Sequence, residues 1–141
     1  MLNAHQVALA TRCLWGLQES TTTIEGVVLV GTNGIAITAT LNNIDQIQRL
    51  SALSAALFLL GEQTSETAGR GVADEVQIQI RKGNNQLLLA DFRPIGLQAV
   101  LVTLHQGSPE HPTLEINIVL AVNYLGALLR GEELQPPHWR Q

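Results

Sequence analysis

The sequence predicts an α+β domain in which a five-stranded antiparallel sheet carries helices on both faces, in the order α-β-β-α-β-β-β-α. Three observations lead to this class. Asn33-Gly34 lies between two apolar runs and predicts a tight hairpin, because such a turn needs residues that tolerate positive φ. Apolar and polar residues alternate from Val76 to Ile80, which is the period of a strand with one buried face. Ser51–Gly61 is uncharged on every side, so a helix there is expected to be covered on more than one face.

The first helix is expected from Asn3 to Glu19, and two strands follow it. The apolar stripe of this helix recurs at three- and four-residue steps and consists of Val7, Ala10, Leu14 and Leu17. The strand Ile24–Gly31 is apolar on both faces, which places it in the middle of a covered sheet. Strict alternation would put Ile24 on the same face as Val28. The strand Ile35–Leu41 has milder alternation, which is typical of an edge.

The central helix is predicted to begin near Ile44 and to end between Gly61 and Gly69. Asn43 is a suitable cap, and Gln46 lies three residues further on, as in a capping box. Its apolar part is too short to span a bilayer.

Three more strands are predicted at Val76–Arg81, Leu87–Phe92 and Leu97–Leu104. The last two are apolar on both faces and therefore central, whereas the first has one polar face and therefore fits an edge. Hairpin connections pair strands one with two, three with four, and four with five. The order that satisfies all of these constraints is 2-1-5-4-3.

A last helix follows the loop 105–110, with Ser108 or His111 as its cap, and Gly131 ends it. Its apolar stripe consists of Ile118, Val122, Leu125 and Leu129. Residues 1–131 are therefore expected to form a single domain. The tail 132–141, with two prolines and Trp139, is expected to be disordered.

Composition limits the classes of partner. The net charge is −4 without a basic stripe, which disfavours nucleic acid binding. Charged residues make up 14%, against roughly 25% in a typical domain, so another chain is expected to cover part of the surface. A single cysteine, Cys13, and an N-terminus unlike a signal peptide predict a cytoplasmic protein without membrane insertion.

No constellation of residues predicts catalysis, and the expectation is that the protein is no enzyme and has no cofactor or metal. Cys13 lies in an apolar helix, where structural thiols are common. His105 and His111 match no zinc spacing. The segment 31–34 lacks the Lys-Ser/Thr end of a phosphate-binding loop, and the turn interpretation is favoured. Arg70 between two glycines could act on a nucleotide, but an ordinary loop arginine is the favoured interpretation.

The ordered set of segments resembles the roadblock / dynein light chain family over about residues 3 to 130. The segments that carry the resemblance are Ile-Glu-Gly-Val-Val-Leu-Val, then Gly-Thr-Asn-Gly-Ile-Ala-Ile, then Leu-Ser-Ala-Leu-Ser-Ala-Ala-Leu, and Gly-Arg-Gly before an alternating strand. The resemblance implies the sheet order given above and dimerisation through the central helix and the third strand. Carried to this chain, it points to Leu50, Ser54, Leu57, Phe58, Val76, Ile78 and Ile80.

The resemblance also implies a partner, because members of this family are similar to proteins that bind small Ras-like GTPases. The leading hypothesis is therefore a non-catalytic homodimeric scaffold or regulator of such a GTPase, with stimulation of GTP hydrolysis as one form of regulation. Two alternatives stay open: a small-ligand sensor and a purely structural dimerisation module. The sequence predicts few polar residues inside the core, which counts against a ligand site.

Overall fold

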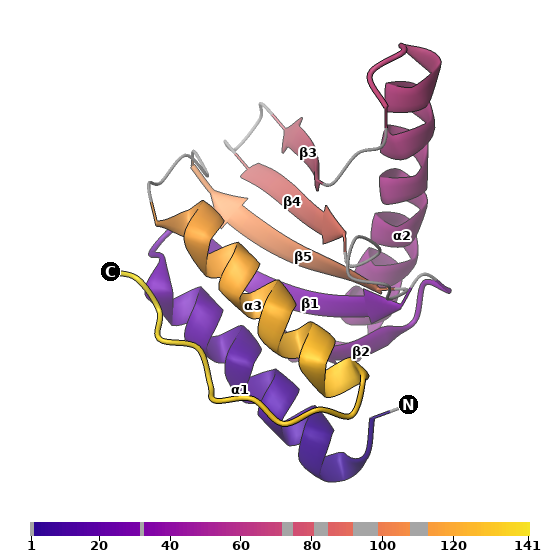
Figure 1. The fold of residues 1–141 in the computed structure, drawn as a ribbon. Helices are drawn as coiled ribbons and strands as arrows, with labels where there is room; N and C mark the ends of the chain where they lie inside the picture. The colour runs from indigo at the N-terminus through magenta and orange to yellow at the C-terminus, as the bar shows by residue number, and fades with distance from the viewer. Residues whose placement is uncertain (1, 32, 72–74, 81–84, 92–98, 108–112) are drawn as a thin grey trace.

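The computed structural model describes residues 2–31, 33–71, 75–80, 85–91, 99–107 and 113–141; for 75–80 and 85–91 it describes the backbone. The chain is a layered α+β structure with antiparallel strands, as the sequence predicted (Figure 1). Its elements are α1 (Ala4–Ser20), β1 (Ile24–Gly31), β2 (Ala36–Ala39), α2 (Ile44–Thr67), β3 (Glu75–Ile80), β4 (Asn85–Asp91), β5 (Ala99–Gln106) and α3 (Leu114–Leu129).

The strands form one sheet in the order β2-β1-β5-β4-β3. β1 pairs with β5 along its length, for example Leu29 opposite Leu101. Both strands are buried on their two faces, which explains their continuous apolar sequences. β2 and β3 are the two edge strands. The predicted strand ends at Arg81, Phe92 and Leu97 lie outside the described residues.

Two apolar layers hold the helices to the sheet. On one face, α1 and α3 pack with Leu29 and Leu101 around a core that includes Leu14 and Leu125. On the other face, Phe58 of α2 packs against alternate residues of the same two strands, which are Val28, Val30, Val100 and Val102. α2 thus lies on the sheet face opposite the other two helices.

A bulge in β1 overturns one detail of the predicted facing. Ile24 packs in the layer under α1 and α3, on the opposite face from Val28. The register between β1 and β5 shifts between Ile24 and Gly26. One extra residue in β1 at this point turns the side chains that precede it to the opposite face of the sheet.

The hairpin between β1 and β2 turns where it was predicted. Gly34 has a φ of 82°, and the Asn33 side chain accepts a hydrogen bond of 3.1 Å from the Ile35 amide. β2 is shorter than predicted because Ile35 is still part of the turn, with its carbonyl accepting from the Gly31 amide.

Side chains cap two of the helices. Asn43 accepts a 3.0 Å hydrogen bond from the Gln46 amide and caps α2 as predicted. Asn3 and Gln6 form a reciprocal capping box on α1. α3 begins after Thr113, whose side chain makes no capping hydrogen bond, and the expected caps Ser108 and His111 lie outside the described residues.

The C-terminal tail differs from the expectation of disorder. Residues 132–141 run as an extended segment back across α1 and α3 (Figure 1). Trp139 packs on the core under these helices, and Arg140 exchanges hydrogen bonds with the buried Asn117 side chain.

Candidate functional site

The outward side of α2 carries a continuous apolar surface in the middle of the helix. Leu53 is 61% exposed, Leu60 58% and Leu59 47%. We call the exposed set Ala52, Leu53, Ala56, Leu59 and Leu60 the outer α2 face. The set recurs at three- and four-residue steps, so its members share one side of the helix. Several large apolar side chains gathered on one helix face mark an interaction surface, unlike single scattered ones.

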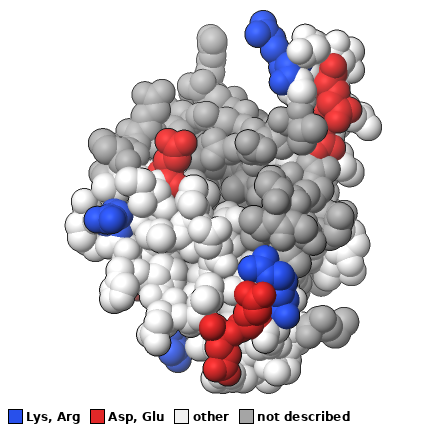
Figure 2. All heavy atoms as spheres, viewed as in Figure 1, with Lys and Arg blue, Asp and Glu red and all other residues white. Residues whose placement is uncertain are grey.

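Charged residues bracket this surface at its two ends. Asp45 and Arg49 are exposed on the first turns of α2, and Glu66 and Arg70 are exposed at its far end. Charged residues make up 14% of the chain, and on the face shown in Figure 2 the charged side chains of the described residues lie in a few separate groups. The outer α2 face therefore presents an apolar centre with a charged rim, which is the anatomy of a protein–protein interface.

The opposite side of α2 lies against the sheet and includes two residues that the family resemblance placed at the dimer interface. Ser54 is fully buried, and Phe58 is 2% exposed and packs among the valines of β1 and β5. The other two predicted helix positions, Leu50 and Leu57, are half-buried on its flank. Ser54 and Phe58 thus contact the chain's own sheet and do not lie on the outer α2 face.

The sequence missed the outward leucines for a simple reason. Ser51–Gly61 is uncharged all round, so its pattern does not say which side faces the sheet. The available signal was residue size: Ser51, Ser54 and Ala55 are the small residues that let the helix approach the strands closely. The bulkier Leu53, Leu59 and Leu60 are left outside.

The predicted strand residues Val76, Ile78 and Ile80 lie in β3, at the edge of the sheet beside α2. β3 pairs with β4 on one side, with Val76 opposite Leu89 and Ile78 opposite Leu87. An edge strand has backbone donors and acceptors that a further strand can use. The outer α2 face and this edge strand belong to neighbouring elements.

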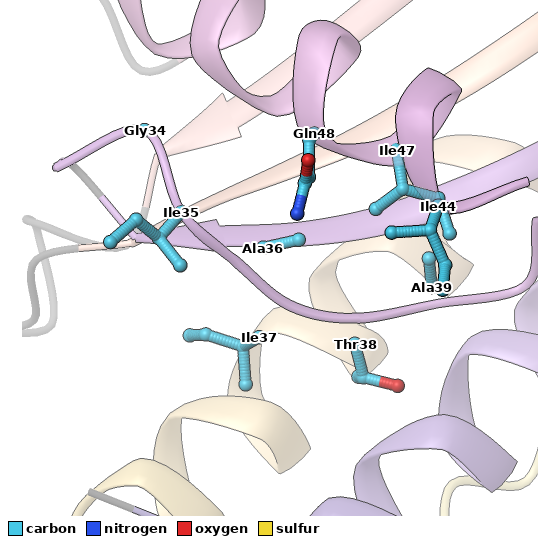
Figure 3. Close-up of a pocket in the computed structure, with 9 residues that line it drawn as sticks. All are labelled: Gly34, Ile35, Ala36, Ile37, Thr38, Ala39, Ile44, Ile47 and Gln48. Atoms are coloured by element: carbon cyan, nitrogen blue, oxygen red, sulfur yellow. The ribbon is translucent and has the colours of Figure 1, made fainter.

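A groove of about 540 Å³ lies at the other edge of the sheet, between β2 and the first turns of α2 (Figure 3). Its walls are mostly aliphatic, with Ile35, Ile44 and Ile47 around it. Figure 3 shows Ile37 and Thr38 pointing to the side of β2 away from α2. The Thr38 hydroxyl is hydrogen-bonded to Thr11, which leaves Gln48 as the main polar side chain of the groove. Small-molecule sites usually combine several polar groups, so this groove fits a ligand poorly.

The buried titratable groups Cys13 and His105 have structural roles. Burial raises the pKa of the Cys13 thiol to about 12, so the thiol is protonated at neutral pH and is a poor nucleophile. Burial lowers the pKa of His105 to about 4, so its ring is neutral. The ring lies between two threonine hydroxyls, with Nε2 2.8 Å from Thr103 Oγ1 and Nδ1 3.4 Å from Thr23 Oγ1.

The other residues considered for chemistry do not come together. His111 lies outside the described residues. Arg70 is exposed in a turn after α2, where Gly69 and Gly71 both have positive φ. Within the described residues, no group of three histidine, cysteine or acidic side chains is placed to hold a metal ion. No helix in that part of the chain is both long and apolar enough to cross a membrane.

Comparison with known proteins shows a fold and no sequence family. No protein-family model matches the chain, and no curated protein matches it by sequence. The structure is similar to a Roadblock/LC7 domain from Streptomyces avermitilis at 16% identity, with a TM-score of 0.75 over 85% of this chain and 97% of that one. It is also similar to MglB from Myxococcus xanthus at 14% identity, with a TM-score of 0.74 over 97% of this chain and 99% of that one.

Further MglB structures agree with these. The gliding protein MglB from Thermus thermophilus shares 14% identity and a TM-score of 0.74, over 93% of this chain and 96% of that one. An MglB described in a tetrameric arrangement gives a TM-score of 0.75 at 14% identity, over 93% of this chain and 95% of that one.

Proposed function

We propose that this chain, which has the roadblock fold, is a non-catalytic homodimeric scaffold or regulator that binds a small Ras-like GTPase. The observation that carries the proposal is the outer α2 face, an uncharged helix surface beside an edge strand. The family resemblance of the sequence and the similarity to MglB over nearly the whole chain support the GTPase as the partner.

The outer α2 face fits a second copy of itself. In a two-fold dimer the same surface meets itself, and an axis perpendicular to α2 makes the two helices antiparallel. Ala56 lies at the centre of the face, with Leu53 before it and Leu59 and Leu60 after it. Two antiparallel copies centred on Ala56 would place Leu53 of one protomer against Leu59 and Leu60 of its partner. Small Ala52 and Ala56 would let the two helices approach closely. Each leucine fully buried in this way contributes about 1.5–3 kcal/mol.

The edge strand β3 would add backbone hydrogen bonds to the proposed dimer. Pairing of β3 with its copy would join two sheets and use the backbone groups left at the edge. Val76, Ile78 and Ile80 are then interface residues, as the resemblance implied. The predicted helix positions are replaced by Leu53, Leu59 and Leu60, with Leu50 and Leu57 at the flank.

The mechanism we propose is positional. A dimer offers a composite surface from two protomers, and a GTPase whose switch loops fit that surface in one nucleotide state is held in that state. The binding partner shifts the equilibrium by its difference in affinity for the two states. The mechanism does not use the Cys13 thiol, which is protonated and buried. We also place the protein in the cytoplasm, where small GTPases work.

The two alternatives make different demands. A ligand sensor would need a polar pocket, and the groove beside β2 offers mainly the Gln48 amide. A purely structural dimerisation module would use the outer α2 face without any nucleotide dependence. Nucleotide dependence of partner binding therefore separates the proposal from both.

The experiment captures small GTPases from extract of the source cells on immobilised protein, with a GTP analogue in one sample and GDP in the other. We expect enrichment of one GTPase in one nucleotide state. Leu60→Asp places a charge inside the proposed interface, where Leu60 would face Leu53 of the partner. Val119→Asp is the matched control because Val119, on α3, is also an exposed helical residue, 54% exposed. Leu60→Asp should be monomeric and capture less, and Val119→Asp should behave as wild type. Equal capture in both nucleotide states, or none in either, would count against the proposal.

A further inference from the structure

The C-terminal tail is held in the groove between α1 and α3 at two points near its end. From Gly131 the chain reverses and runs back along α3, toward the start of that helix (Figure 1). Trp139 and Arg140 make the two attachments described below. Residues 132–136 are exposed, and within the described part of the chain the segment 133–138 makes no hydrogen bond.

In the first attachment, the indole of Trp139 packs against Gly16. Trp139 lies over Gly16 of α1, and its side chain lines a cavity of about 410 Å³ together with Cys13 and Tyr124. A Cβ on Gly16 would lie 2.9 Å from Trp139 Cε2 and 3.1 Å from Cζ2, closer than van der Waals contact allows. Glycine inside a helix costs about 1 kcal/mol relative to alanine. The glycine in the middle of α1 is therefore explained by the space that the indole needs.

The second attachment recognises backbone and not a side chain. Asn117 Oδ1 accepts a hydrogen bond of 2.8 Å from the Arg140 amide, and Asn117 Nδ2 donates one of 3.0 Å to the Arg140 carbonyl. Asn117 is fully buried in α3, so without this partner its amide would be left unsatisfied. Asn117 bonds both the amide and the carbonyl of one residue. It therefore recognises the backbone of an extended peptide, whatever the side chain at that position.

We propose that the groove between α1 and α3 is a binding site for an extended peptide, and that the chain's own residues 132–141 are its exchangeable ligand. The site selects an indole for the space over Gly16, followed directly by a residue whose backbone pairs with Asn117. The tail stays bound because its short connection to α3 gives it an effective concentration of roughly millimolar. The segment 133–138 makes no hydrogen bond within the described residues, so the hydrogen bonds that release must break near the end of the tail are the two between Arg140 and Asn117. The inference is independent of the proposed GTPase partner.

The test uses full-length chains and a fluorescently labelled peptide with the sequence of residues 132–141. In Trp139→Ala the resident tail loses its indole and leaves the site over Gly16 vacant. In Gly16→Ala/Trp139→Ala the same site is vacated and then filled by the new methyl group, while the added alanine favours the helix. Circular dichroism checks that all three proteins are folded, and fluorescence anisotropy measures peptide binding.

We expect the peptide to bind Trp139→Ala about tenfold or more tightly than wild type, since a tail that leaves its groove vacant one time in ten reduces apparent affinity tenfold. The double variant should lose this binding. Equal affinity for wild type and Trp139→Ala would overturn the proposal, as would undiminished binding to the double variant or no binding to Trp139→Ala.

Discussion

Acid should destabilise this protein through one residue, His105. The ring is 1% exposed, on the side of the sheet covered by α1 and α3, and its hydrogen-bond partners are the hydroxyls of Thr103 and Thr23. Burial lowers its pKa from 6.5 to about 4, because a charged imidazolium would lose its hydration there. In the unfolded chain the ring regains its ordinary pKa.

The sign and size of the effect follow from this difference. Above pH 6.5 the ring is neutral in both states, and its contribution to stability is complete. As the pH falls below 6.5, the unfolded chain binds a proton that the folded chain does not, and the free energy of unfolding decreases by up to about 1.4 kcal/mol per pH unit. The loss is about 2 kcal/mol at pH 5 and about 3 kcal/mol once the pH reaches the folded-state pKa. Against a total stability of roughly 5–15 kcal/mol, this is a large fraction.

The assay is urea unfolding followed by circular dichroism at about pH 7.5 and about pH 5. His105→Gln is the control, since glutamine keeps a polar side chain between the threonines without titrating in this range. The wild type should lose about 2 kcal/mol more than the variant between the two pH values. Other titrating groups act on both proteins and cancel in the comparison. An equal loss in both proteins would refute the reasoning about His105.

Three further predictions concern the fold. Phe58→Ala should lower the free energy of unfolding by about 3–5 kcal/mol because it empties the layer between α2 and the sheet; a loss under about 1 kcal/mol in urea unfolding would contradict the inward position of Phe58. Asn43→Ala should cost about 1 kcal/mol by removing the cap that accepts from the Gln46 amide, and unchanged stability would argue against this cap. Cys13, the one thiol, should react slowly with a thiol reagent in the native protein and faster in Trp139→Ala; identical rates would mean that Trp139 does not cover the thiol.

Strand facing was predictable wherever the chain is regular. The continuous apolar runs of β1 and β5 indicate burial on both faces, and the structure buries both. The alternation at Val76–Ile80 indicates an edge, and β3 lies at one. Ile24 was assigned to the wrong face because a bulge is set by local backbone geometry, and its sequence looks like that of a regular strand.

Two other features were beyond sequence reasoning for different reasons. The sequence did not indicate which side of α2 faces the sheet, because Ser51–Gly61 lacks the charges that usually mark the outer side of a helix. The tail was expected to be disordered because it contains two consecutive prolines and shows no pattern of a helix or strand. Its attachments depend on two residues elsewhere, Gly16 and Asn117. Gly16 inside α1 and Asn117 inside the mostly apolar α3 were the available signals. They become meaningful only once α1 and α3 are known to lie side by side.

The central claim is that a dimer formed through the outer α2 face binds a small GTPase in one nucleotide state. The most direct measurement is a binding titration of the captured GTPase, purified and loaded with a GTP analogue or with GDP, against wild type, Leu60→Asp and Val119→Asp of known mass in solution. We predict that wild type and Val119→Asp are dimers and bind the GTPase at least about tenfold more tightly in one nucleotide state than in the other. Leu60→Asp should be a monomer and should have lost this binding. Equal affinity for both nucleotide states, or full binding by a monomeric Leu60→Asp, would contradict the account.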